Sequence, residues 1–381
     1  MNSSRKYVKR QTKKAVKKVA KKHPVLTFFV ILVLIACIVG GYFVYNKYFK
    51  KKVPIVGEFS VHFLTLGNDY AGDSIYIKAG ENDILIDAGS KTDSVDDISN
   101  YIDQYVSDNT LEFVIATHAD TDHIAGFSNR DSTNSSKTQS IFDLYVCKTI
   151  IDFPLTNKTT QTYNEYLLER EDEIKEGAIH YNALECYKEQ NGAKRVYSLG
   201  ESMSMEILYN YYYEHPSDKE NNYSVCLLFR HGDKQFLFTG DLEKKGEEYL
   251  AEKYNFTQVD LFKAGHHGSI TSSNEVLLNE IQPAICVVTC SAGENTYGAA
   301  QENIFPSQEF INRISEWTES VYVTTLGDDD FTGDKDFMDM NGNVIISSTE
   351  KGIQVICSNN STLLKDTEWF KARRTTPPKW Q

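Results

Sequence analysis

The stretch Thr117-His118-Ala119-Asp120-Thr121-Asp122-His123 places two imidazoles and two carboxylates within six consecutive positions. Such a group is costly to bury, or to crowd into a loop, unless a cation offsets the repulsion and desolvation of its charges. Two further segments, Thr239-Gly240-Asp241 and Gly265-His266-His267-Gly268-Ser269, supply an aspartate and a pair of histidines. Together the three segments predict a metal site assembled from distant parts of the chain.

Each of these segments follows an apolar run that is typical of a buried strand, at 111–117, 235–239 and 259–263. Because sites in α/β proteins usually lie at the carboxyl ends of strands, we expect the three groups to meet at one edge. The polar segment 128–200 is expected to cover one side of the site. Further strands are predicted at 59–66, 73–78, 83–89 and 225–230, and helices at 93–107, 162–175 and 243–254.

The N-terminal region differs from the rest of the chain in charge. Residues 1–52 carry 14 of the 40 Lys and Arg residues and no Asp or Glu, which leaves 26 basic and 53 acidic residues beyond them, a net charge of −27. Within this basic region, 25–45 is a 21-residue run without a charge, long enough to cross a hydrocarbon core as a helix. A cleaved signal peptide usually has a shorter apolar run, so we predict an uncleaved single-pass anchor.

The flanking charges set the expected orientation and domain organisation. Ten Lys and Arg residues precede the apolar run and four follow it closely, so the positive-inside rule places the tail 1–24 in the cytoplasm. We expect a linker over 46–57, an extracellular hydrolase domain over 58–358 and a C-terminal tail over 359–381. The acidic surface of that domain does not favour DNA as a partner, because tight non-specific binding of nucleic acid needs a basic groove.

Several motifs agree in order with one known family. Beside the three ligand segments, these are Gly72-Asp73-Ser74, 84–89, Gly126 and 222–225. Their arrangement resembles the metallo-β-lactamase superfamily and, within it, the hydrolase domain of the ComEC-type competence proteins, over residues 59 to about 350. The resemblance implies a four-layer αβ/βα sandwich with metal ions at one edge. It also implies that a metal-bound hydroxide attacks a phosphodiester, an ester or a lactam.

Two features depart from the commoner superfamily pattern. Asp120 stands where HxHxDH has its second histidine, and no separate histidine completes the first metal site, near which Asn221 and Asn222 lie. Both features are shared with the ComEC-type pattern, and they make one site richer in oxygen, which shifts the balance from zinc towards manganese. The pair Tyr297-Gly298 also lacks the His-Pro that often follows it, which puts substrate contacts there in doubt.

The resemblance implies two divalent metal ions, zinc or manganese. His118 and Asp120 are expected to bind one ion, and Asp122 and His123 the other. Asp241 is expected to bridge them, because a carboxylate has two oxygens that can share two cations.

The remaining roles are less fully determined by the sequence. One of His266 and His267 is expected to bind an ion while the other faces the substrate. The sequence does not decide between them, so both are candidate ligands. His267 is also a candidate catalytic residue. Asp120 or Asp122 is expected to accept a proton during catalysis. Asp87 either orients a ligand histidine through a hydrogen bond or caps a turn.

The leading functional hypothesis is a membrane-anchored, extracytoplasmic, metal-dependent hydrolase that acts as a phosphodiesterase or a nuclease-like enzyme. The first alternative is an esterase or lactone hydrolase that acts on wall polymers or small signals. The second is a non-catalytic, metal-binding surface module that recognises a partner. The expected substrate is a small molecule or polymer with a phosphodiester or ester bond, and the oligomeric state is left open.

Overall fold

The computed structural model describes residues 54, 56–68, 70–128, 139–292, 304–326, 340–349 and 351–381. The predicted cytoplasmic tail and the apolar run at 25–45 lie outside these residues. Within the described part of the chain, no helix is both long and apolar enough to cross a membrane. Contacts divide the chain into Met1–Pro54 and Ile55–Gln381, and both sheets belong to the second of these units.

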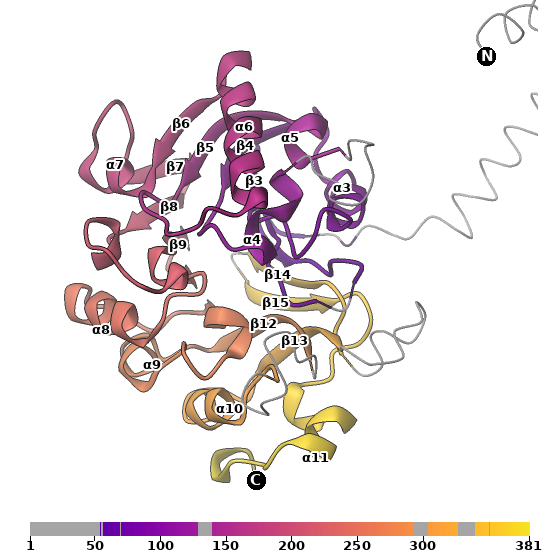
Figure 1. Cartoon of the computed structure of the whole chain (residues 1–381). Helices are drawn as coiled ribbons and strands as arrows, with labels where there is room; N and C mark the ends of the chain where they lie inside the picture. The colour runs from indigo at the N-terminus through magenta and orange to yellow at the C-terminus, as the bar shows by residue number, and fades with distance from the viewer. Residues whose placement is uncertain are drawn as a thin grey trace, which may run out of the picture. The chain divides into compact units, whose positions relative to one another are not determined.

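Two sheets form the centre of this unit (Figure 1). Among the described residues the first sheet has the strand order β15-β14-β1-β2-β3-β4-β5-β6 and the second has the order β13-β12-β11-β10-β9-β8-β7. The first comprises β1 (Phe59–Phe63), β2 (Ile75–Ala79), β3 (Asn82–Ile86), β4 (Thr110–Ile115), β5 (Val146–Asp152), β6 (Ile179–Asn182), β14 (Val344–Thr349) and β15 (Gly352–Cys357). The second comprises β7 (Val196–Gly200), β8 (Met203–Leu208), β9 (Cys226–His231), β10 (Lys234–Phe238), β11 (Leu261–Lys263), β12 (Ile285–Ala292) and β13 (Val321–Leu326).

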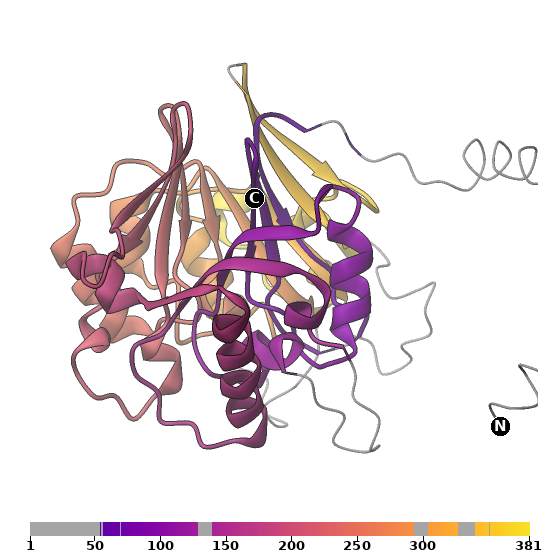
Figure 2. The same ribbon diagram turned by 90° about the horizontal axis from the view of Figure 1, so that it is seen from above.

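The two sheets pack face to face, with helices on their outer sides (Figure 2). Between the sheets, the ring of Phe59 on β1 lies 4.7 Å from Phe236 on β10 and 6.2 Å from Phe229 on β9, measured between centroids. This arrangement confirms the predicted αβ/βα sandwich. The helices are α3 (Ser94–Ile102), α4 (Thr121–Ile124), α5 (Ile141–Leu144), α6 (Gln161–Glu176), α7 (Ala183–Lys188), α8 (Lys244–Lys253), α9 (Glu275–Ile281), α10 (Gln308–Ile314) and α11 (Glu368–Arg373).

The direction of the strands explains where a site can form. Strands β3 to β6 pair in parallel in one sheet, and β10 to β13 pair in parallel in the other. Parallel strands bring their carboxyl ends to the same edge, where α/β proteins place their ligands. The loops that follow β3, β4, β10 and β11 begin at this edge, and they carry the polar residues that the sequence singled out.

The segment 128–200 differs from its expected role as a polar cover. Besides α5, α6 and α7 it supplies β5, β6 and β7, which extend both sheets. Strand β6 lies at the edge of its sheet, and its residues are exposed or only partly buried. The alternation of apolar and polar residues that marks a half-buried strand is therefore weak in this segment.

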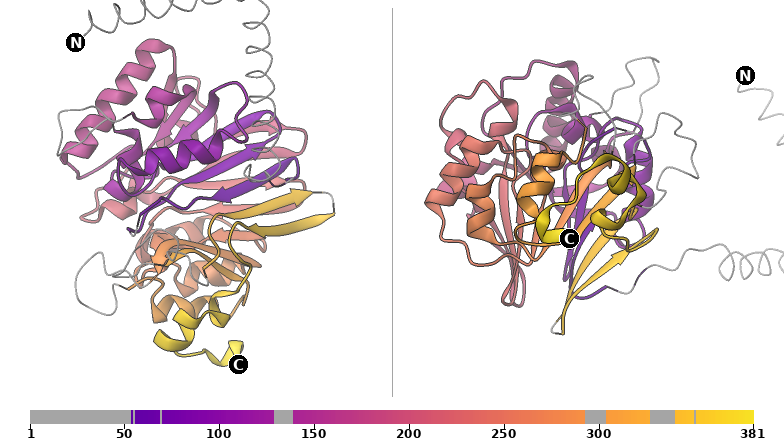
Figure 3. Two further views of the ribbon diagram at one scale, coloured as in Figure 1. Left: turned by 90° about the vertical axis from the view of Figure 1, so that its right-hand side faces the viewer. Right: turned by 90° about the horizontal axis from the view of Figure 1, so that it is seen from below.

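The C-terminal residues 359–381, expected to form a tail, fold back onto the domain (Figure 3). Trp369, Phe370 and Trp380 are buried in the apolar cluster outside the second sheet. The indole nitrogen of Trp380 donates a hydrogen bond to the carbonyl oxygen of Thr318 at 3.0 Å. The burial of three large aromatic side chains keeps this segment in place, so the folded region extends past 358.

Candidate metal centre

The loop after β4 carries the histidine- and aspartate-rich stretch, and Asp87 organises it. Asp87 follows β3 and accepts hydrogen bonds from the backbone nitrogen and the hydroxyl of Thr117, both at 2.7 Å. Its Oδ2 also accepts a 2.7 Å hydrogen bond from Nδ1 of His123. This contact directs the other nitrogen of the ring, Nε2, towards Asp241. Of the two roles considered for Asp87, the structure therefore matches the orienting one.

Asp241 enters the same space from the second sheet. It follows β10 after Gly240, where φ is +54° and an added Cβ would come within 2.8 Å of the Ser224 hydroxyl, so only glycine fits. Its Oδ2 faces the imidazoles, at 3.2 Å from Nε2 of His123 and 3.5 Å from Nε2 of His267. Its Oδ1 lies on the other side, 3.5 Å from Nζ of Lys263. The two oxygens of Asp241 therefore face different partners, and only Oδ2 points into the histidine cluster.

The adjacent histidines after β11 point to different places. Both have a left-handed backbone, with φ of +46° at His266 and +53° at His267, which turns their rings 67° apart. His267 is fully buried, and its Nδ1 donates a 2.7 Å hydrogen bond to the carbonyl oxygen of Thr289. Its Nε2 lies 3.5 Å from Oδ2 of Asp122. His266 instead lines a pocket and hydrogen-bonds through Nδ1 with the Thr271 hydroxyl at 2.9 Å.

Three groups of side chains in the described part of the chain have the proximity that a metal ion needs. They differ in how well their polar atoms are already satisfied. The buried Nε2 atoms of His118 and His267 have no hydrogen-bond partner. By contrast, the third group is held together by its own hydrogen bonds and by Lys263. The groups are His118, His123 and Asp241; Asp122, His123 and His267; and Asp73, Asp87 and His123.

Unsatisfied buried nitrogens therefore mark the first two groups as the ones that fit a metal. All seven residues predicted from the sequence lie at or beside these groups. Asp120 joins them through a 3.5 Å approach of its Oδ2 to Nε2 of His118. His266 lies at the margin, with its Nε2 3.8 Å from Oδ2 of Asp241. The cofactor inferred from this donor set is a divalent metal ion.

The protonation behaviour of the site shows an excess of negative charge. Although burial disfavours an imidazolium, the carboxylates of Asp241 and Asp73 raise the pKa of His267 to about 10. Burial likewise opposes the charged form of Asp122, yet the imidazole of His267, 3.5 Å from its Oδ2, and the imidazole of His123 hold the pKa of its carboxyl well below the usual range. Groups that attract protons so strongly also attract metal cations, which displace those protons on binding.

Lys263 is a buried charged residue beside the candidate ligands that the sequence did not single out as part of the site. It lies at the end of β11, is 1% exposed, and forms an ion pair with Asp73 beneath the histidine cluster. Asp73 also accepts a hydrogen bond from the Thr289 hydroxyl, next to the carbonyl that holds His267. The one available signal was a lysine at the end of an otherwise apolar strand.

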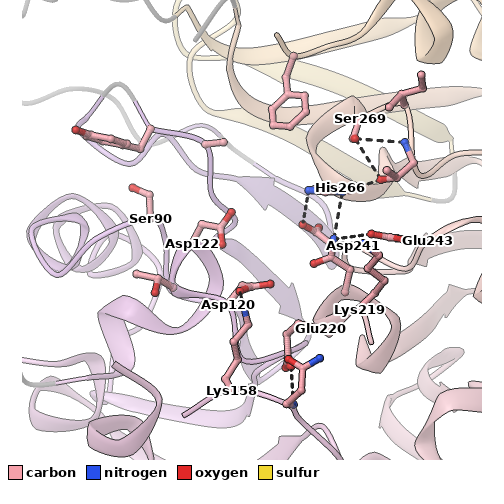
Figure 4. A pocket seen from close by; sticks show the side chains of 18 of the residues that line it. Ser90, Asp120, Asp122, Lys158, Lys219, Glu220, Asp241, Glu243, His266 and Ser269 are labelled. Carbon is pink, nitrogen blue, oxygen red and sulfur yellow. Dashed lines mark hydrogen bonds and ion pairs between the residues drawn. The ribbon is translucent and has the colours of Figure 1, made fainter. Parts of the chain in front are cut away.

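A pocket of about 640 Å³ opens beside the cluster (Figure 4). Asp120, Asp122, Asp241 and His266 line it, whereas His118, His123 and His267 are buried behind these residues. Asn221, near the place of the missing histidine, also lines the pocket, with its amide nitrogen 3.2 Å from Glu243. The rest of the charged lining consists of three lysines, Lys91, Lys158 and Lys219, and three carboxylates, Asp218, Glu220 and Glu243, none of which the sequence singled out.

Comparison with known proteins agrees with this geometry. A family model for the metallo-beta-lactamase superfamily matches residues 67–129. ComE operon protein 3 of Bacillus subtilis is 27% identical over 185 residues, which cover 49% of this chain and 20% of that protein. Competence protein ComA of Neisseria gonorrhoeae is 39% identical over 106 residues, covering 26% of this chain and 14% of its own. The chain thus matches no more than a fifth of the length of either relative.

Solved structures with a similar fold are more distant. The metallo-beta-lactamase fold protein YhfI from Bacillus subtilis has a TM-score of 0.40 at 12% identity, and the match covers 70% of this chain and 96% of that one. CmlA, a diiron beta-hydroxylase from Streptomyces venezuelae, has a TM-score of 0.42 at 12% identity, and the match covers 71% of this chain and 53% of that one.

Proposed function

We propose that this chain, which carries a metallo-beta-lactamase domain and has homologues among the ComEC-type competence proteins, is a metal-dependent phosphodiesterase. The observation that carries the proposal is the convergence of both sheets on one cluster with unsatisfied imidazole nitrogens. His118 comes from the first sheet and His267 from the second, and Asp241 lies between them. Most buried polar atoms in folded proteins have a hydrogen-bond partner, so two unpartnered imidazole nitrogens in one cluster support a metal site.

The donor set suggests how two ions would be held. His118, Asp120 and Asp241 would hold the first, and Asp122, His123 and His267 the second, with the carboxylate of Asp241 close enough to serve both. Because the first set offers one nitrogen and two carboxylates, it suits manganese as well as zinc. When bound, two such ions supply a hydroxide nucleophile near neutral pH and stabilise the negative charge of the transition state.

The chain's own residues would complete the reaction. Asp120 and Asp122 line the pocket and keep their carboxylates ionised, because neighbouring groups hold the pKa of each below its usual range despite burial. Both are therefore ionised and available to a metal ion, and we propose that one of them also takes up a proton during the reaction. His266 faces the pocket and is placed to contact the substrate, and Asp87 keeps the ring of His123 in orientation.

The lysines of the pocket support a phosphodiester over a neutral ester once metal is bound. Lys91, Lys158 and Lys219 line the pocket beside six carboxylates, Asp120, Asp122, Asp218, Glu220, Asp241 and Glu243. Two divalent ions would offset much of this negative charge, and together with the lysines they would attract an anionic group. Because the rest of the surface is acidic, we expect a small substrate, or the end of a polymer, to be preferred over long duplex DNA.

Turnover tests this proposal. The full chain, purified in detergent and loaded with Mn²⁺ or Zn²⁺, is expected to hydrolyse bis(p-nitrophenyl) phosphate, to lose that activity with a chelator and to regain it when metal is restored. Hydrolysis of p-nitrophenyl butyrate without phosphodiester cleavage would instead identify an esterase. Absence of both activities in protein shown to contain metal would favour the non-catalytic binding module.

We further propose that the domain is anchored at the cell membrane and faces the exterior. The basic flank of the apolar run 25–45, which precedes the described residues, is the basis for this orientation. Protease added to intact cells is expected to remove the domain beyond residue 60, whereas a tag placed before residue 24 is expected to be cut only after the cells are opened. Protection of the domain in intact cells would contradict the orientation.

A further inference from the structure

We propose that Lys158 determines specificity by binding the anionic group of the substrate next to the first metal site. This inference deepens the proposed function, and it rests on it. It is carried by the place of Lys158 in the pocket and by the way the surrounding residues hold it there.

Lys158 reaches the pocket from the loop between β5 and α6, and its ammonium pairs with Oδ1 of Asp120 (Figure 4). The other oxygen of Asp120 lies 3.5 Å from the unsatisfied Nε2 of His118. The lysine therefore touches the outer side of a carboxylate whose inner side faces the proposed metal. The side chains of Lys158 and Asp120 are 29% and 25% exposed, so a ligand in the pocket can reach both.

The loop that carries Lys158 is fixed by a buried carboxylate. Glu220 is 6% exposed and accepts hydrogen bonds from the Thr156 hydroxyl at 2.8 Å and from the backbone nitrogen of Asn157 at 2.9 Å. It also accepts one from the backbone nitrogen of Ala119, the residue before Asp120, at 3.1 Å. The Thr156 hydroxyl in turn accepts from the backbone nitrogen of Lys158 at 3.0 Å. Glu220 thus ties the lysine's loop directly to the metal-binding loop.

Metal binding changes what Lys158 can pair with. A divalent ion held by His118 and Asp120 would take up the negative charge of that carboxylate and would repel the neighbouring ammonium. Lys158 then needs a new anion within reach, and its backbone cannot retreat because Glu220 holds the loop. A phosphodiester supplies a negative non-bridging oxygen that lies between the ion and the ammonium, whereas a neutral ester does not. The arrangement therefore selects for the phosphoryl group.

A role confined to holding Asp120 in place makes the opposite prediction for metal affinity. If Lys158 only supported Asp120, removing it would loosen the carboxylate and weaken metal binding. If it binds the substrate's anion, removing its positive charge would leave metal affinity unchanged or raise it, and would weaken anion binding. Metal affinity and anion affinity measured on the same variant therefore separate the two roles.

The experiment compares the wild-type chain with Lys158→Met, Lys158→Arg and Lys148→Met. Lys148 pairs with Glu112 at 2.8 Å and is 58% exposed on β5, so its replacement makes the same charge change away from the pocket. Calorimetry measures binding of Mn²⁺ and then of inorganic phosphate to the metal-loaded protein, and melting curves check folding. Lys158→Gln provides a second neutral variant if methionine prevents folding.

We expect Lys158→Met to weaken phosphate binding by about 10-fold or more, the usual effect of losing a charge-assisted hydrogen bond. Metal affinity should not fall, Lys158→Arg should retain most of the phosphate affinity, and Lys148→Met should match the wild type. Three results would overturn the inference. The metal-loaded wild type does not bind phosphate, Lys158→Met binds phosphate as well as the wild type does, or Lys158→Met loses phosphate binding together with metal binding. Phosphate titration measures binding and needs no turnover. A failure of the phosphodiesterase proposal would appear only in the turnover assay, so the two failures can be told apart.

Discussion

Replacing Asp241 with asparagine is expected to lower turnover by about a thousand-fold or more and to reduce metal content below two ions per chain. The Oδ2 of Asp241 faces the Nε2 atoms of both His123 and His267, at 3.2 and 3.5 Å. Asparagine keeps the shape of the side chain but removes the negative charge that two cations would share. Metal analysis and kcat on the same preparation measure both effects.

Folding of this variant should survive, because β10 retains its packing through Phe236 and Phe238, which are 0% and 1% exposed. A melting curve recorded with the metal analysis provides this control. If Asp241 merely capped its turn, the variant would instead lose about 0.5–2 kcal/mol of stability and keep its activity. Unchanged metal content and unchanged turnover would remove Asp241 from the site and would refute the shared-ligand arrangement.

The second large effect is expected from replacing the adjacent histidines, His266 and His267, one at a time. Each variant serves as the control for the other. His267→Asn is expected to weaken the binding of one ion by about 100-fold and to abolish most turnover, because Nε2 of His267 is buried and unsatisfied. His266→Asn is expected to keep the metal content and to lower turnover less, since its ring lines the pocket. Asparagine tolerates the left-handed backbone at both positions, which separates the loss of the ring from backbone strain.

Calorimetric titration with Mn²⁺ and steady-state kinetics on the two variants check this prediction. The assignment of His267 as the ligand fails if His266→Asn loses the metal and His267→Asn retains it. Equal loss in both variants would indicate that the two rings share one ion, which their 67° interplanar angle and separate partners argue against.

The part of the site that could be predicted from sequence consists of residues in short, dense motifs. His118, Asp120, Asp122 and His123 stand close together after an apolar run, so their delivery from a strand end could be foreseen. The choice between His266 and His267 could not, because it depends on the left-handed turn at both residues and on the carbonyl of Thr289.

Residues that act from a distance escaped prediction for a physical reason. Lys158 stands in a polar segment, Glu220 follows Asp218 and Lys219, and Lys263 shows only that a lysine ends an apolar strand, so no local pattern places these residues at the site. Only folding shows that Glu220 and Lys263 are 6% and 1% exposed. The strands β5 and β6 were missed for a related reason. β6 lies at the edge of its sheet and β5 begins with exposed residues, so neither shows a clear apolar alternation.

The origin of the ligands in both sheets has a consequence for how the protein matures. His123 and His267 are 144 residues apart in sequence, so a growing chain cannot offer the complete candidate donor set until β11 has joined its sheet. Ions held at that point favour the fully folded chain over any partly folded form. If the domain folds outside the cell, as proposed, it would draw its metal from the surroundings, and external metal supply would control how much finished protein accumulates.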